Sequence, residues 1–161
     1  MLNRHFLDFL GLLAKHNVEH LVVGGYAVGV HGFPRFTCAL DIFVAMSREN
    51  AGRLIDVFGE FGFASLNLKP EDFLEPDTVV EIGREPMKIQ ILTGIDGVSF
   101  DRCRRDSILV NVSGIQVPFI GLEALMANKA ASPRSKDRID LEELTRLRAL
   151  QGNRDPDREI D

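Results

Sequence analysis

The residues best suited to chemistry lie in one stretch of the chain, from Leu21 to Ala45. Within it, Gly24 and Gly25 end one apolar run, and Asp41 lies inside the next apolar run. A glycine turn between a buried strand and a helix lets backbone N–H groups approach a phosphate closely, and the helix N-terminus adds a favourable dipole. A carboxylate on a strand is an oxygen ligand for Mg²⁺. The stretch therefore indicates a site for a phosphorylated ligand and a divalent cation.

One position of this stretch departs from that chemistry. Residues 39 and 41 share one face of the predicted strand, because strand side chains alternate between two faces. Carboxylates at both positions would give a rigid pair of metal ligands, but the sequence has Ala39 beside Asp41. Metal ions carry most of the charge stabilisation in phosphoryl chemistry, so if this site serves such a reaction, we predict that the chain turns over substrate poorly.

Two further groups of polar residues accompany the glycine turn. On the predicted strand 87–92, Lys88, Gln90 and Leu92 share a face, and Gln90 either lines a site or is inert sheet polarity. Near the C-terminus lies a charged segment whose members are Lys129, Arg134, Lys136, Asp137 and Asp140. Taken alone, this segment is typical of a charged helix–turn–helix with local ion pairs. Its lysine and arginine side chains also suit phosphate groups.

The stretch GGYAVGVHGFPRFTCALDIFV resembles the signature of the nucleotidyltransferase (polymerase-beta-like) superfamily, in which two small residues precede Asp-x-Asp on a strand. It is most similar to the minimal nucleotidyltransferases related to AbiE-type toxins of toxin–antitoxin systems. Those proteins commonly read Arg-x-Thr-x-Asp-hydrophobic-Asp. This chain matches at Arg35, Thr37 and Asp41 and departs at Ala39. The second charged segment matches the lysine and the basic–Asp pair of the same toxins, so the resemblance spans roughly residues 5–150.

The resemblance implies transfer of a nucleoside monophosphate from an NTP, with Mg²⁺ or Mn²⁺, to the 3′ end of tRNA or to a protein acceptor. It also implies an antitoxin as a partner. The residues implied in catalysis are Asp41, Lys129 and Asp137. Those implied in binding the nucleotide are Gly24, Gly25, Arg35, Thr37 and Gln90. The implied metal ligands are Asp41 and the residue at the position of Ala39.

Three accounts of Ala39 stay open. It is an engineered change of Asp in an otherwise active enzyme, or it marks a natural pseudoenzyme that still binds nucleotide. Gln90 favours the pseudoenzyme, because the resemblance implies a further carboxylate on that strand. In the third account, Asp41 and another carboxylate hold one metal ion with reduced turnover. The alternative to an impaired nucleotidyltransferase is therefore a non-catalytic nucleotide-binding or partner-binding module on the same fold.

The elements needed to position these residues follow from hydrophobic periodicity and turn signals. We predict strands at 21–23, 37–44, 78–83, 87–92, 108–111 and 115–120, with a short edge strand at 63–68. Helices are predicted at 3–16, 47–61, 69–74, 99–105, 121–129 and 135–150, with a further short helix directly after the glycine turn. This order predicts an α/β (α+β) fold, a mixed β-sheet with helices packed around it, in agreement with a nucleotidyltransferase fold.

The composition suits a globular protein of 161 residues with 45% hydrophobic and 27% charged residues. We expect a single nucleotidyltransferase-like domain over residues 1–150 and a polar, disordered tail over 151–161. A net charge of −5 argues against a broad nucleic-acid surface. A tRNA site would instead be a local patch of Arg102, Arg104, Arg105, Arg134 and Lys136. The first residues have charged residues within their apolar pattern, so we expect no signal peptide there, and no apolar run is long enough for a membrane. We therefore expect a cytoplasmic protein with no membrane partner.

Overall fold

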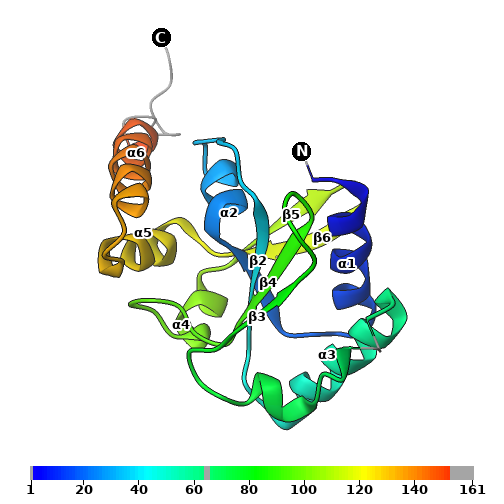
Figure 1. Ribbon diagram of the computed structural model, residues 1–161. Helices are drawn as coiled ribbons and strands as arrows, with labels where there is room; N and C mark the ends of the chain where they lie inside the picture. The colour runs from blue at the N-terminus through cyan, green and yellow to red at the C-terminus, as the bar shows by residue number, and fades with distance from the viewer. Residues whose placement is uncertain (1, 64–65, 153–161) are drawn as a thin grey trace.

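The computed structural model describes residues 2–63 and 66–152 and is built around one six-stranded mixed sheet (Figure 1). Its strands are β1 (His20–Val23), β2 (Ala39–Val44), β3 (Val79–Ile82), β4 (Lys88–Leu92), β5 (Ile108–Val112) and β6 (Ile115–Phe119). Its helices are α1 (Arg4–Lys15), α2 (Gly24–Val30), α3 (Arg48–Phe61), the 3₁₀-helix η2 (Pro70–Phe73), α4 (Phe100–Arg105), α5 (Leu122–Ala131) and α6 (Ser135–Gly152). The predicted α+β class with a mixed sheet is confirmed.

The strand order is β3-β4-β2-β1-β6-β5, which places β2 near the centre of the sheet. β2 pairs antiparallel with β1 and parallel with β4, and β4 pairs antiparallel with β3. In this register Asp41 of β2 lies opposite Gln90 of β4, and Gln90 lies opposite Glu81 of β3. The sheet therefore arranges Asp41, Gln90 and Glu81 in one row across three adjacent strands.

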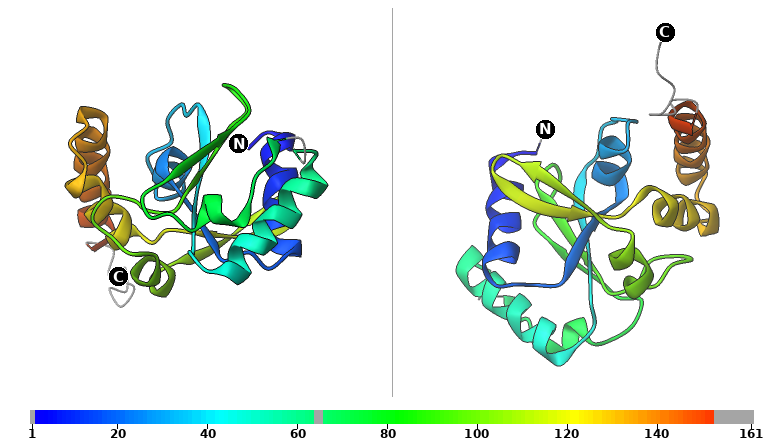
Figure 2. Two further views of the ribbon diagram at one scale, coloured as in Figure 1. Left: turned by 60° about the horizontal axis from the view of Figure 1, so that its bottom comes forward. Right: turned by 180° about the vertical axis from the view of Figure 1, so that it is seen from behind.

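The two faces of the sheet have different partners. Helices α1 and α3 lie side by side on one side of the sheet, and α5 and α6 lie on the other (Figures 1 and 2). On the side of α1 and α3, Phe9 packs against Phe58 with a ring separation of 5.7 Å. Leu40 and Ile42 of β2 are fully buried, whereas Ala39 and Asp41 alternate with them and face the other side. On the opposite face, Phe43 is also buried, so only the first part of β2, with Ala39 and Asp41, is left for polar chemistry.

Local signals explain the ends of α3 and its link to the sheet. The Ser47 hydroxyl accepts a hydrogen bond from the Asn50 backbone N–H, and Gly62 ends the helix with a φ of 96°. The Asn50 side chain is buried and bonds the backbone of both Glu19 and Ala45. A residue in the first turn of α3 thereby joins the start of β1 to the end of β2.

Two expectations from the sequence need correction. Residues 63 and 66–68 form no strand, and residues 64–65 lie outside the described part of the chain. The antiparallel β3–β4 pair takes that edge of the sheet instead, while Phe63 and Leu68 pack against the core from an irregular segment. The second correction concerns the C-terminus, where α6 continues to Gly152, two residues into the expected tail. The rest of that tail, 153–161, lies outside the described residues.

The helices also bear on a membrane location. None of the helices in the described part of the chain is both long enough and apolar enough to span a membrane.

Candidate active site

A cleft of about 610 Å³ lies on the sheet face that carries Ala39 and Asp41. The strands β2, β4 and β3 form its floor, and α5 and the start of α6 contribute to its wall. The predicted site residues that line it are Gly24, Gly25, Arg35, Thr37, Ala39, Asp41, Gln90 and Lys129. The remaining predicted residue, Asp137, is buried directly behind Lys129. The structure thus brings together two segments that lie about a hundred residues apart in the sequence.

Glycine is required at both positions of the turn. Gly24 has a φ of +70°, and a Cβ there would overlap the carboxylate of Asp41. A Cβ at Gly25 would lie 2.7 Å from the Thr37 hydroxyl oxygen, closer than real contacts allow. Helix α2 begins at Gly24 with no side-chain cap, so the N–H groups of its first turn lack intrahelical partners. The turn is therefore a close packing of backbone against the two motif side chains.

Asp41 is held in an electrostatically unusual position. Its Oδ1 atom is buried and has no hydrogen-bond partner among the described residues. Burial raises the pKa of Asp41 to about 6, against the opposing effect of Lys136, Lys129, Arg134 and Lys88. A buried, unpartnered carboxylate oxygen is costly unless a cation or a proton satisfies it. The carboxylate is therefore poised to accept a positively charged group.

Lys129 lies at the centre of a buried ion-pair network. Its ammonium is 2.7 Å from Asp137 Oδ1 and 2.9 Å from Asp140 Oδ2, and all three side chains are nearly inaccessible. Burial opposes ionisation of Asp137, but hydrogen bonds from Lys129 and Ser132 outweigh it and lower the pKa of Asp137 to about 2. An ammonium has three donors, so two carboxylates leave one direction free. Asp137 and Asp140 thus position Lys129 at the cleft wall.

Arg35 and Thr37 brace the segment between α2 and β2. The Arg35 guanidinium donates to Asp140 Oδ2 at 2.8 Å, which joins this segment to α6. The Thr37 hydroxyl donates to the carbonyl of Ala39 at 3.2 Å and packs against Gly25. These contacts brace the segment, and Arg35 also lines the cleft, where the resemblance implies that it binds the nucleotide.

The structure adds Glu81, a site residue that the sequence analysis missed. Glu81 lines the cleft from β3, accepts a hydrogen bond from Gln90 Nε2 at 2.9 Å and lies 3.3 Å from the Lys88 ammonium. Its signal in the sequence is a single acidic residue inside the apolar strand Val79–Ile82. Only the pairing of β3 with β4 shows that this residue shares a face with Asp41.

The residues present fit one divalent cation better than two. No group of three or more His, Cys, Asp or Glu side chains in residues 2–63 and 66–152 is arranged to hold a metal ion. Ala39 takes the place of the expected second carboxylate on β2, and Gln90, opposite Asp41, offers an amide and not a carboxylate. The orphaned Oδ1 of Asp41 still offers one strong oxygen ligand.

Several other polar residues lie outside the cleft. His31 Nε2 contacts the carbonyl of Ile120 at 2.8 Å and does not line the cleft. The arginines of α4 are also outside it, and Arg104 pairs with Glu19. The proposed basic patch is therefore divided, because Arg134 and Lys136 line the cleft and the α4 arginines do not.

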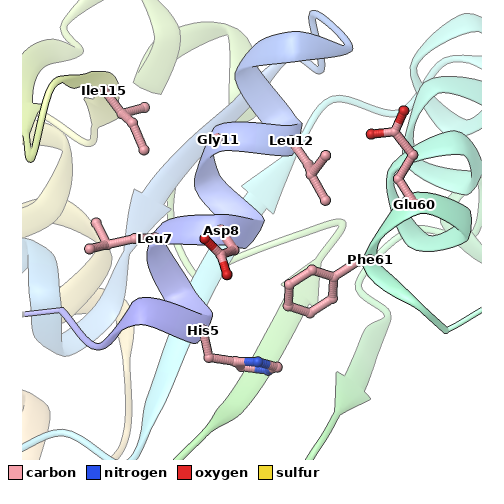
Figure 3. Close-up of a pocket in the computed structure, with 8 residues that line it drawn as sticks. All are labelled: His5, Leu7, Asp8, Gly11, Leu12, Glu60, Phe61 and Ile115. Carbon is pink, nitrogen blue, oxygen red and sulfur yellow. The ribbon is translucent and has the colours of Figure 1, made fainter.

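A second hollow of about 610 Å³ lies between α1 and α3 (Figure 3). Its lining includes His5, Asp8, Glu60 and Phe61. It has no glycine turn, and no lysine or arginine is among its lining residues in the described chain. It therefore lacks the features of a triphosphate site.

Comparisons with known proteins agree with this geometry at the level of the fold. No protein-family model and no curated protein sequence matches the chain. Among solved structures, a candidate nucleotidyltransferase from Thermotoga maritima, TM1012, is similar with a TM-score of 0.55 and 17% identity, covering 96% of this chain and 97% of that one. The lincosamide antibiotic adenylyltransferase LnuA, solved with lincomycin, gives 0.55 and 13%, covering 91% and 98%. ANT(2″)-Ia in complex with adenylyl-2″-tobramycin gives 0.52 and 15%, covering 92% and 95%. The chain therefore has the nucleotidyltransferase fold.

Proposed function

We propose that the cleft binds a nucleoside triphosphate and that the chain is a nucleotidyltransferase with impaired turnover. The observation that carries this proposal is the convergence of Gly24, Asp41 and Lys129 on one cleft. A glycine turn, a strand carboxylate and a held lysine are what a triphosphate site needs: close backbone, a cation ligand and fixed positive charge.

The residues divide into three roles. Gly24 and Gly25 let the start of α2 approach the phosphates, and Lys129 presents its ammonium from the opposite wall. Asp137 and Asp140 keep that ammonium in place. A divalent cation on Asp41, when bound, neutralises the charge that develops on the transferred phosphoryl group.

The acceptor follows from the sequence resemblance to AbiE-type toxins. We propose an RNA acceptor, the 3′ end of tRNA, or a protein acceptor, together with an antitoxin partner and a cytoplasmic location. Lys136 and Arg134 are the basic residues of the predicted patch that line the cleft, so they are the ones placed to meet an RNA backbone. LnuA was solved with lincomycin bound and ANT(2″)-Ia in complex with adenylyl-2″-tobramycin, so a small molecule of this kind is the competing acceptor class.

Ala39 sets the expected level of activity. The position on β2 that would carry the second carboxylate of the pair has an alanine, and its Cα lies opposite that of Lys88 on β4. The alternative function is a non-catalytic module that binds nucleotide or a partner through the same cleft. The impaired enzyme should regain transfer of the nucleoside monophosphate when residue 39 is changed to a carboxylate, whereas the non-catalytic module should not.

A labelled-NTP transfer assay tests the proposal. The Ala39→Asp variant should incorporate label from at least one NTP into total RNA or total protein at a rate at least about tenfold above the unaltered chain. Ala39→Asn is the matched control, because it adds similar volume without charge. Thermal shifts with each NTP and Mg²⁺ measure binding separately, since a ligand of the folded state raises apparent stability.

Nucleotide binding without transfer by Ala39→Asp supports the non-catalytic alternative. Absence of both binding and transfer contradicts the whole proposal. Label on an antibiotic and on neither macromolecule replaces the RNA or protein acceptor with a small molecule.

A further inference from the structure

We propose that β5 is a docking edge for the β5 strand of a second copy of this chain, so that two sheets join around a two-fold axis at Val110. β5 is the last strand in the order of the sheet, and within residues 2–63 and 66–152 it pairs only with β6. No backbone hydrogen bond from any other element reaches it in that part of the chain. Its outer edge is therefore an unpaired template for a further strand.

β5 lacks the features that protect most sheet edges. Its sequence, ILVNV, contains no charged residue and no proline, and it pairs with β6 through five consecutive residues without a bulge. Two of its apolar residues are exposed, Leu109 at 70% and Ile108 at 38%. The opposite edge strand, β3, instead carries the exposed carboxylate of Glu81. Charge, proline or a bulge usually blocks an edge strand, so β5 is the edge that is open to pairing.

The turn between β5 and β6 shows which backbone groups of β5 face outward. Val112 pairs with Ile115, and the two residues between them have φ values of 50° and 88°, as in a type I′ hairpin turn. A hydrogen bond joins the first and last residues of such a turn, and bonded and non-bonded pairs alternate along an antiparallel ladder. Leu109 and Asn111 therefore form non-bonded pairs with β6, in agreement with Pro118 opposite Leu109, since proline has no N–H. The N–H and C=O groups of Leu109 and Asn111 thus face the open edge.

These backbone groups fit a second copy in one symmetric register. If the two Val110 residues lie opposite each other in antiparallel strands, Leu109 of each copy lies opposite Asn111 of the other, and the two exchange both hydrogen bonds. A register centred on Leu109 would need the N–H of Ser107, which already donates to a carbonyl in the preceding turn. A register centred on Asn111 would need Ser113, which has a positive φ in the hairpin turn. The register centred on Val110 is therefore the one that pairs the open edge with itself.

The side chains of β5 are compatible with this register. On one face, Ile108 lies opposite Val112 of the second copy, and the two Val110 side chains meet at the axis. Val110 and Val112 already pack against the core of their own copy, so this face continues the apolar layer from one sheet to the next. On the other face, the two Leu109 side chains are diagonal neighbours, within reach of long side chains. No like charges oppose each other along the strand.

The pairing leaves the candidate active site open in both copies. The cleft lies over β2, β4 and β3, whereas β1 and β6 separate β2 from β5. No residue of β5 lines the cleft. Assembly through β5 is therefore separable from nucleotide binding.

Light scattering after size-exclusion chromatography of the full chain measures the assembly. The unaltered chain should have twice the 18.0 kDa mass of one copy and should dissociate on dilution. Leu109→Lys should raise the dissociation constant of the dimer at least about tenfold, because it removes an apolar contact and places two like charges at diagonal positions. Gln116→Lys is the matched control, since Gln116 is exposed on the same face of the hairpin but lies on β6, one strand away from the pairing edge. Far-UV circular dichroism confirms that each variant is folded.

A cysteine at the two-fold axis tests the register without adding charge. The α-carbons of a non-bonded antiparallel pair are about 4.5 Å apart, within the range that a disulfide spans. Val110→Cys should therefore form a disulfide-linked dimer when reductant is removed, as seen by non-reducing electrophoresis. Val112→Cys should not, because its two copies are offset by four residues along the paired strands. The unaltered chain, with Cys38 and Cys103 as free thiols, gives the background.

A single-copy mass at every concentration overturns the proposal. A dimer that Leu109→Lys leaves unchanged, or that Gln116→Lys weakens equally, also contradicts it, because the contact would then lie elsewhere. A disulfide in Val112→Cys and not in Val110→Cys excludes the register. Assemblies larger than two copies are incompatible with it too, since pairing of one edge with itself closes at the dimer.

Discussion

The carboxylate of Asp41 lies against the α-carbon of Gly24, in the space that a side chain at residue 24 would fill. The glycine turn and the strand carboxylate are therefore one packed unit, and each constrains the other. Gly24 also has a φ of +70°, a conformation that favours glycine over residues with a Cβ. Two physical requirements thus select glycine at the same position.

We predict that Gly24→Ala destabilises the fold by about 2 kcal/mol or more, because left-handed strain of roughly 1–2 kcal/mol adds to overlap with Asp41. Chemical denaturation measures the free energy of unfolding. Gly62→Ala is the control, since Gly62 has a φ of +96° and open space around its Cβ position. Equal losses in the free energy of unfolding for Gly24→Ala and Gly62→Ala would show that overlap with Asp41 does not contribute to the destabilisation.

The stability of the protein should depend on the ionisation of Asp41. Burial raises the pKa of Asp41 to about 6 in the folded state, above its ordinary value of 3.8. The folded state therefore binds the proton more tightly than the unfolded state. The stability that comes from this proton is fully present below about pH 4 and is lost as the pH rises through about 6.

Asp41→Asn removes this titration. Relative to the unaltered chain without metal, the variant should gain about 2–3 kcal/mol of stability between about pH 4 and pH 7.5. Urea denaturation of both proteins across that range, with EDTA present, measures the difference. A difference that stays constant with pH would mean that Asp41 titrates near its ordinary value.

Lys129→Met should destabilise the protein by about 3 kcal/mol, because it leaves the buried carboxylates of Asp137 and Asp140 without their shared cation. It should also reduce any NTP-dependent rise in melting temperature. Lys15→Met is the control, since Lys15 pairs with Glu60 at the surface and exposed ion pairs contribute about 0–1 kcal/mol. A loss for Lys129→Met no larger than for Lys15→Met would contradict the network described here.

Phe36 is 80% exposed at the cleft, between the braced residues Arg35 and Thr37. An exposed ring beside a nucleotide can stack on a base for about 1–3 kcal/mol. Phe36→Ala should therefore weaken nucleotide binding at least about fivefold by titration calorimetry, with the free energy of unfolding unchanged within about 0.5 kcal/mol. Leu109→Ala removes a residue that is 70% exposed and does not line the cleft. An equal effect of both variants on binding would rule out a specific role for Phe36.

Much of this protein was determined by sequence alone, because local signals decide local structure. The alternation around Asp41 and the helical periodicity of residues 47–61 predicted β2 and α3 close to their observed bounds. The resemblance of the glycine and charged segments predicted residues that the fold then placed in one cleft. These predictions depend on residues near one another in the chain, where spacing fixes geometry.

Only the tertiary structure decided how distant segments meet. Glu81 joins Asp41 through strand pairing that no local pattern reveals, since a shift of one residue in register would turn its side chain to the other face. Arg35 contacts α6 because Asp140, far along the chain, lies within 2.8 Å of its guanidinium. The expected strand at 63–68 was wrong for a related reason: a short apolar segment fits either an edge strand or an irregular connection, and the β3–β4 pair takes that edge. Long-range pairing, which spacing along the chain does not encode, set each of these outcomes.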